Sequence, residues 1–88
     1  MVTEQWVVGP EYDERLFRRL GAVLKSMGFN LDSKWDGICG SQDISHWELK
    51  SPDGALVIES ETYMGLSVEG PAELVQRVRQ QFEVNHAR

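Results

Sequence analysis

Cysteine is almost absent from this chain: Cys39 is the only one among 88 residues. A single cysteine cannot form an internal disulfide bond, and this scarcity favours the reducing environment of the cytoplasm. No apolar run is long enough to span a bilayer. Residues 1–5 show neither the basic nor the apolar region of a secretory signal. We therefore expect a cytoplasmic protein that does not associate with membranes.

Basic residues are also few. Nine lysines and arginines stand against 14 aspartates and glutamates, which gives a formal net charge of −5. The excess is concentrated in residues 29–69, where eight acidic residues accompany only Lys34 and Lys50. Such a segment repels phosphate groups, so we do not expect nucleic acid as a partner. A basic protein partner is compatible with this charge, although the simpler role of net charge is to keep a small protein soluble.

The common motifs of catalysis and cofactor binding are missing as well. The sequence contains no glycine-rich phosphate loop, no Gly-x-Ser-x-Gly turn and no His-Glu-x-x-His motif. Zinc sites use paired cysteines or histidines at short spacing, whereas this chain has one cysteine and two histidines. We therefore expect no cofactor and no metal ion.

One pattern occurs twice. Residues 5–11 and residues 66–73 each run from a short apolar stretch through Gly-Pro to an acidic residue. Proline suits the first turn of a helix, and an acidic side chain there interacts favourably with the helix dipole. Apolar residues then recur with the spacing of one helix face. The pattern predicts a strand followed by a helix at both places, with helices over residues 10–27 and 71–83.

Between these helices, apolar and polar residues alternate with a period of two, which is typical of strands with one buried face. Ser-Pro-Asp-Gly at residues 51–54 has the composition of a tight turn between two strands. Pairing around this turn places Trp47 opposite Ile58 on the apolar face. The same register places His46 opposite Glu59 on the polar face.

The fold class follows from this order of elements. A further strand is predicted near residues 30–38, with a loop over residues 39–43, so the order is β-α-β-β-β-(β)-α. Because only one face of the strands is apolar, both helices should pack on the same face of a mostly antiparallel sheet. The prediction is therefore an α+β fold, an open-faced two-layer sandwich. Residues 1–88 are expected to form a single domain, with a frayed tail over residues 84–88.

The pair of His46 and Glu59 is the first candidate for a functional site. An imidazole beside a carboxylate can serve as a general base or as a pH-sensitive binding position. The simpler interpretation is a cross-strand polar pair that contributes roughly 0.2–1 kcal/mol to stability. No nucleophile is spaced to meet this histidine, which favours the simpler interpretation.

The remaining candidates are binding residues. Glu48 and Glu61 belong to the same predicted polar face as His46. Trp35 and Tyr63 have no place in the predicted core, and amphipathic aromatic residues outside a core are typical anchors of protein interfaces. Alternatively, these two side chains only close the edges of the sheet.

Three hypotheses for function remain. The leading one is a non-catalytic protein-binding or adaptor module, with an unknown protein partner or a second copy of the chain docked on the open sheet face. The alternative is a small enzyme or metal-dependent domain that uses His46, Glu59 and Cys39. The third is an inhibitor-like protein that binds a basic partner through the acidic middle of the chain.

Overall fold

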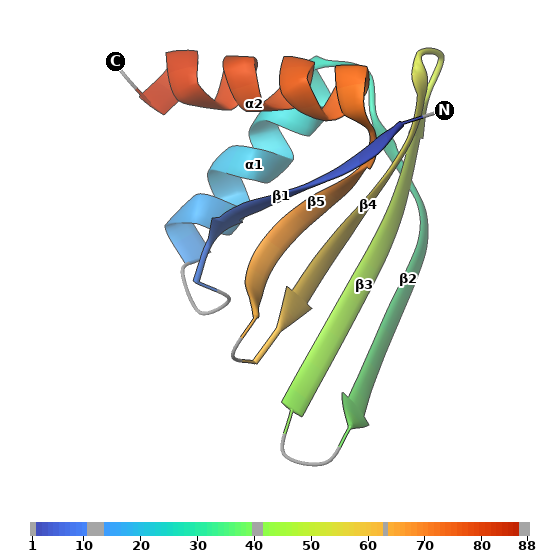
Figure 1. The fold of residues 1–88 in the computed structure, drawn as a ribbon, viewed down its shortest axis with the longest axis vertical. Helices are drawn as coiled ribbons and strands as arrows, with labels where there is room; N and C mark the ends of the chain where they lie inside the picture. Colours follow the sequence, from blue (N-terminus) through green and yellow to red (C-terminus); the bar gives the residue numbers. More distant parts are fainter. Residues whose placement is uncertain (1, 11–13, 40–41, 63, 87–88) are drawn as a thin grey trace.

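The computed structural model describes residues 2–10, 14–39, 42–62 and 64–86. These residues form five strands and two helices (Figure 1). In chain order the elements are β1 (Thr3–Gly9), α1 (Glu14–Ser26), β2 (Asn30–Cys39), β3 (Gln42–Ser51), β4 (Gly54–Glu61), β5 (Gly65–Pro71) and α2 (Ala72–His86).

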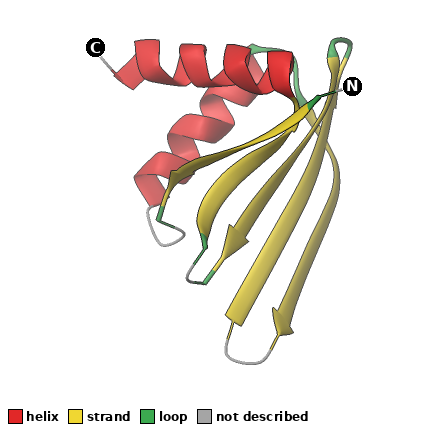
Figure 2. Cartoon of the chain, in the orientation of Figure 1, coloured by secondary structure: helices red, strands yellow, loops and turns green. Residues whose placement is uncertain are grey.

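The five strands form one antiparallel sheet in the order β1-β5-β4-β3-β2. The first strand of the chain therefore lies beside the last, and β1 and β2 are the two edges. Three consecutive hairpins join β2 to β5, while α1 connects the two edge strands. Figure 2 shows both helices on one side of the sheet. The α+β fold predicted from the sequence is confirmed.

The core lies between the helices and one face of the sheet. Trp6 of β1 contacts Phe82 of α2, with ring centroids 5.4 Å apart. Trp47 of β3 contacts Phe17 of α1 at 5.0 Å. Neither helix described by the structure has the length and apolar character needed to cross a membrane. The buried apolar residues are Leu20, Val23, Leu24, Phe29, Leu56, Ile58, Leu66, Val68, Leu74, Val75, Val78 and Phe82.

The β3–β4 hairpin has the predicted register. Trp47 pairs with Ile58 and His46 pairs with Glu59 around the turn at residues 51–54. The turn chemistry and the alternation of apolar residues agree on this register, and a slip of one residue would have turned the apolar side chains toward solvent.

The predicted loop over residues 39–43 is wrong in its extent. β2 continues to Cys39 and β3 begins at Gln42, and these two residues pair with each other. Only residues 40–41, which lie outside the described residues, remain between the strands. The β2–β3 hairpin is therefore longer than predicted, because backbone pairing continues through a segment whose glycines and polar residues resemble a loop.

The boundaries of α2 also differ from the prediction. Pro71 still pairs with Thr3 as the last residue of β5, so the helix begins at Ala72. Proline is tolerated there because the strand ends at this residue. The helix then continues to His86, so residues 84–86 of the expected frayed tail are helical.

The helix α1 ends in a glycine turn. Gly28 has a φ of +89°, the left-handed conformation that glycine adopts without steric cost. The N–H of Phe29 donates to the carbonyl of Leu24 at 3.0 Å, and the N–H of Gly28 donates to that of Lys25 at 3.1 Å. These bonds satisfy carbonyl groups at the end of the helix and direct Phe29 into the core.

Candidate functional site

The sheet face opposite the helices carries side chains from all five strands, and we call it the open face. Successive residues of a strand point to opposite faces, so the register identifies its members in rows across the sheet. One row consists of Trp35, His46, Glu59, Ser67 and Val7. The adjacent row consists of Ser33, Glu48, Val57, Glu69 and Gln5.

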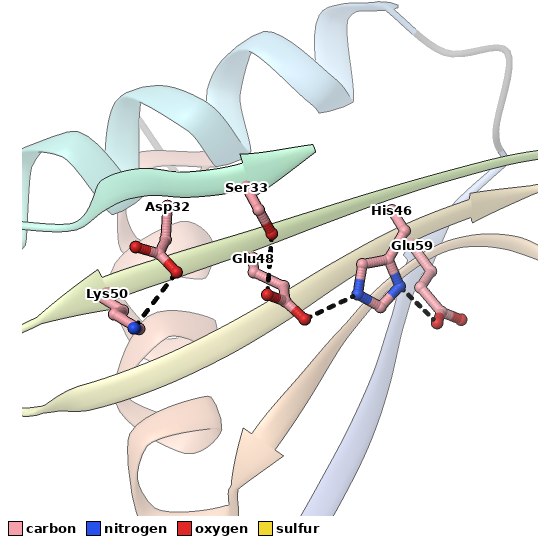
Figure 3. A network of polar contacts seen from close by, with 6 residues as sticks. All are labelled: Asp32, Ser33, His46, Glu48, Lys50 and Glu59. Carbon is pink, nitrogen blue, oxygen red and sulfur yellow. Dashed lines mark hydrogen bonds and ion pairs between the residues drawn. The ribbon is translucent and has the colours of Figure 1, made fainter. Parts of the chain in front are cut away.

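His46 lies between two carboxylates on this face (Figure 3). Its Nδ1 is 3.1 Å from Oε1 of Glu59, and its Nε2 is 3.5 Å from Oε1 of Glu48. The hydroxyl of Ser33 donates a hydrogen bond to the other oxygen of Glu48 at 2.8 Å. Both ring nitrogens therefore face carboxylates of the neighbouring residues on the open face.

The open face is strongly acidic. Among its described residues, the only lysine or arginine is Lys50, whose Nζ lies 3.2 Å from a carboxylate oxygen of Asp32 (Figure 3). That lysine is thus already paired. The acidic residues of the open face are Asp32, Glu48, Glu59, Glu61 and Glu69.

Apolar side chains border this acidic surface at both edges. Trp35 on β2 is 57% exposed. A Cβ atom added to Gly37 would lie 2.6 Å from the Trp35 ring, so the indole packs directly against Gly37. At the other edge, Val7 of β1 is exposed. Val7 is absent from the residues predicted from the sequence, although its alternation with Trp6 is the signal that places it here. Tyr63 lies outside the described residues.

The structure does not bring the backbone of Cys39 close to His46. His46 pairs with Trp35, and Cys39 lies four residues farther along β2, at its end. Four residues of an extended strand span about 13 Å. Within the described part of the chain, no group of three histidine, cysteine or acidic side chains is arranged to hold a metal ion.

A small apolar cavity lies on the other side of the sheet, between α1 and β3. Its volume is about 90 Å³, and Phe17, Leu24 and Trp47 are among the residues that line it. Pockets for small organic ligands have volumes of roughly 300–1,000 Å³. This cavity has room for a single apolar side chain and not for an organic cofactor.

A double-mutant cycle will measure the energy of the His46–Glu59 pair. We expect His46→Ala and Glu59→Ala to show a coupling energy of about 0.2–1 kcal/mol in urea denaturation, as for other cross-strand polar pairs. Each partner is only partly buried, so water competes for the interaction. A coupling energy well above about 2 kcal/mol would show that the pair belongs to a more specialised site.

Comparison with protein-family models, with curated proteins and with solved structures finds no match for this chain. The geometry of the open face is therefore the basis for the function proposed below.

Proposed function

We propose that this chain is a non-catalytic protein-binding module whose open face docks a basic segment of a partner protein. The observation that carries the proposal is the charge of this face, where five carboxylates stand against one lysine that is already paired. Such a field attracts lysine and arginine side chains and repels nucleic acid. A cytoplasmic location, inferred from the single cysteine, completes the proposal.

The distribution of side chains on the face supports docking better than catalysis. Carboxylates occupy its centre, whereas Trp35 and Val7 lie exposed at opposite edges. A basic partner can pair its charges at the centre and bury apolar surface at the edges. Trp35 can also receive an arginine guanidinium against its ring, an interaction worth roughly 0.5–2 kcal/mol.

The alternative of a small enzyme or metal-dependent domain has less support. It needs a free ring nitrogen on His46, but both nitrogens face carboxylates. It also needs Cys39 near this histidine, and about 13 Å of strand separates their backbones. No observation favours this alternative over the binding module.

The proposal predicts that neutral substitutions on the open face weaken binding of a cationic ligand. The probe is a short synthetic peptide of alternating arginine and valine, titrated by calorimetry at low ionic strength. We expect the triple variant Glu48→Gln, Glu61→Gln, Glu69→Gln to bind it about 10- to 100-fold more weakly than the unmodified protein, since each lost charge pair removes about 0.5–1 kcal/mol. Added salt should weaken binding by the unmodified protein.

A second triple variant controls for net charge. Glu14→Gln, Glu73→Gln, Glu83→Gln removes the same charge from exposed positions on the two helices. We expect its affinity for the peptide to stay within about threefold of the unmodified protein, because screening limits these distant charges. The proposal is wrong if the unmodified protein does not bind the peptide, or if the two triple variants lose affinity equally.

A further inference from the structure

The outer edge of β2 is open along a long strand. β2 spans 10 residues and is the last strand of the sheet on its side. Figure 1 shows no described element beyond it. In an antiparallel pair, every second residue turns its N–H and C=O away from the neighbouring strand. β2 therefore presents a row of unpaired backbone groups to which another strand can bind.

Large apolar side chains flank this edge on both faces of the sheet. Leu31 pairs with Leu49 on the helix side and is 60% exposed, although it lies beside the core. Trp35, on the open face, is also more than half exposed. An added strand would cover both side chains while it pairs with the backbone.

The charges of β2 complement a second copy of the same strand. Lys34 and Asp36 point to the helix side, and the Lys34 Nζ lies 3.5 Å from an Asp36 carboxylate oxygen. When two identical strands pair about a two-fold axis normal to the sheet, one residue lies opposite itself. With Trp35 at the axis, Lys34 of each copy lies opposite Asp36 of the other, so two ion pairs form.

We propose that two copies of this chain associate through antiparallel pairing of their β2 strands, centred on Trp35. On the helix side of the sheet, Lys34 and Asp36 from the two copies then form a group of four charges around the axis, in which positive and negative groups alternate. On the other face the two Trp35 rings lie side by side, and each Gly37 lies opposite Ser33. The result is a continuous sheet of twice the width, with the two open faces adjacent on one side.

Neighbouring registers are less favourable. With Lys34 at the axis, the two lysines oppose each other, and with Asp36 at the axis, the two aspartates do so. Opposed like charges destabilise a strand pair. A register centred on Ser33 would use the bulge between Leu31 and Ser33, where the ladder of β2 is irregular. Only the register centred on Trp35 pairs Lys34 with Asp36.

The association should be weak and dependent on concentration. Pairing at one edge buries less than the roughly 1,200–2,000 Å² of a typical stable complex. We expect a dissociation constant of about 10–500 µM. Dimerisation through β2 is independent of the proposed function, because the open face can bind a basic partner in the monomer or in the dimer.

Charge reversal tests both the edge and the register, with sedimentation velocity as the measurement. Lys34→Glu places a carboxylate opposite Asp36 of the second copy, and Asp36→Lys places an ammonium group opposite Lys34. We expect each variant alone to dimerise about 10-fold or more weakly than the unmodified protein, since opposed like charges are costly. An equimolar mixture of the two variants restores both ion pairs, so heterodimers should form about as readily as the original dimer.

Arg18→Glu is the matched control, because it makes the same charge change as Lys34→Glu at an exposed position on α1. Its dimerisation should equal that of the unmodified protein, and circular dichroism should show that all variants are folded. The proposal is overturned if the unmodified protein remains monomeric at millimolar concentration. It is also overturned if both charge variants dimerise normally alone, or if their mixture remains monomeric.

Discussion

Replacement of Phe82 by alanine is expected to lower the free energy of unfolding by about 3–5 kcal/mol, the usual cost of truncating a buried phenylalanine. Phe82 is only 7% exposed near the end of α2. Its ring packs edge-on against Trp6 of β1, and the Arg19 guanidinium of α1 lies 4.4 Å from its centroid. The side chain thus joins three elements, and alanine would remove all of these contacts at once.

Val84→Ala is the control for the Phe82 prediction. Val84 lies two residues farther along the same helix but is exposed, so its truncation should change stability by less than about 0.5 kcal/mol. Urea denaturation followed by circular dichroism measures both variants. If they are equally stable, the end of α2 does not pack on the sheet as the structure shows.

The Phe82 prediction also bears on the candidate binding surface. Trp6, which Phe82 contacts, is followed in β1 by Val7, an exposed residue at one edge of the open face. Loss of the Phe82 ring therefore loosens the edge strand that carries Val7. We expect Phe82→Ala to broaden the amide resonances of β1 more than those of the β3–β4 hairpin, where pairing does not depend on this contact.

Local signals account for what could be predicted from the sequence. The β3–β4 hairpin was predictable because its turn residues and its apolar alternation independently require one register. That register brought His46 and Glu59 together, as the structure shows. The end of α1 was likewise predictable, because Gly28 follows the last apolar residue of a helical pattern.

Contacts between distant segments account for what could not be predicted. The pairing of β1 with β5 joins the first strand of the chain to the last, and no local pattern encodes it. Phe17 follows the apolar spacing of α1 and its ring contacts Trp47, yet it is 41% exposed. Phe29 lies outside the helical pattern of α1, yet it is buried because the glycine turn directs it inward.

The two glycines of the repeated Gly-Pro pattern are closely packed, each against a different element. At Gly9 an added Cβ would overlap the side chain of Leu16. At Gly70 it would lie 2.6 Å from Cδ2 of Leu56 and 3.1 Å from the carbonyl oxygen of Ala55. Gly9 of the edge strand β1 is thus covered by a leucine of α1, whereas Gly70 of the inner strand β5 is crowded by a leucine and a backbone carbonyl of the adjacent strand β4. The same pair of residues therefore meets two different packing constraints, one from a helix and one from a neighbouring strand.

Two glycines with nearly the same backbone conformation should respond very differently to alanine. Gly28 and Gly65 have φ values of +89° and +88°, a region that costs an ordinary residue about 1–2 kcal/mol. At Gly28 nothing lies within 4 Å of the added Cβ, so alanine there incurs only the conformational cost. A smaller entropy in the unfolded chain offsets part of this cost, and we expect Gly28→Ala to lose about 1 kcal/mol.

At Gly65 the added Cβ would lie 2.6 Å from the carbonyl oxygen of Gly9, a backbone atom that cannot rotate away. Relief of this overlap requires β1 to move from β5 near the end of their ladder, beside Val7. An overpacked site of this kind costs about 1–3 kcal/mol more, so Gly65→Ala should lose about 2–4 kcal/mol in urea denaturation. Because the two variants share the same conformational cost, equal losses would mean that β1 does not approach Gly65 this closely. A larger loss at Gly65, with hydrogen exchange accelerated in β1, would identify the close approach of the two backbones as its cause.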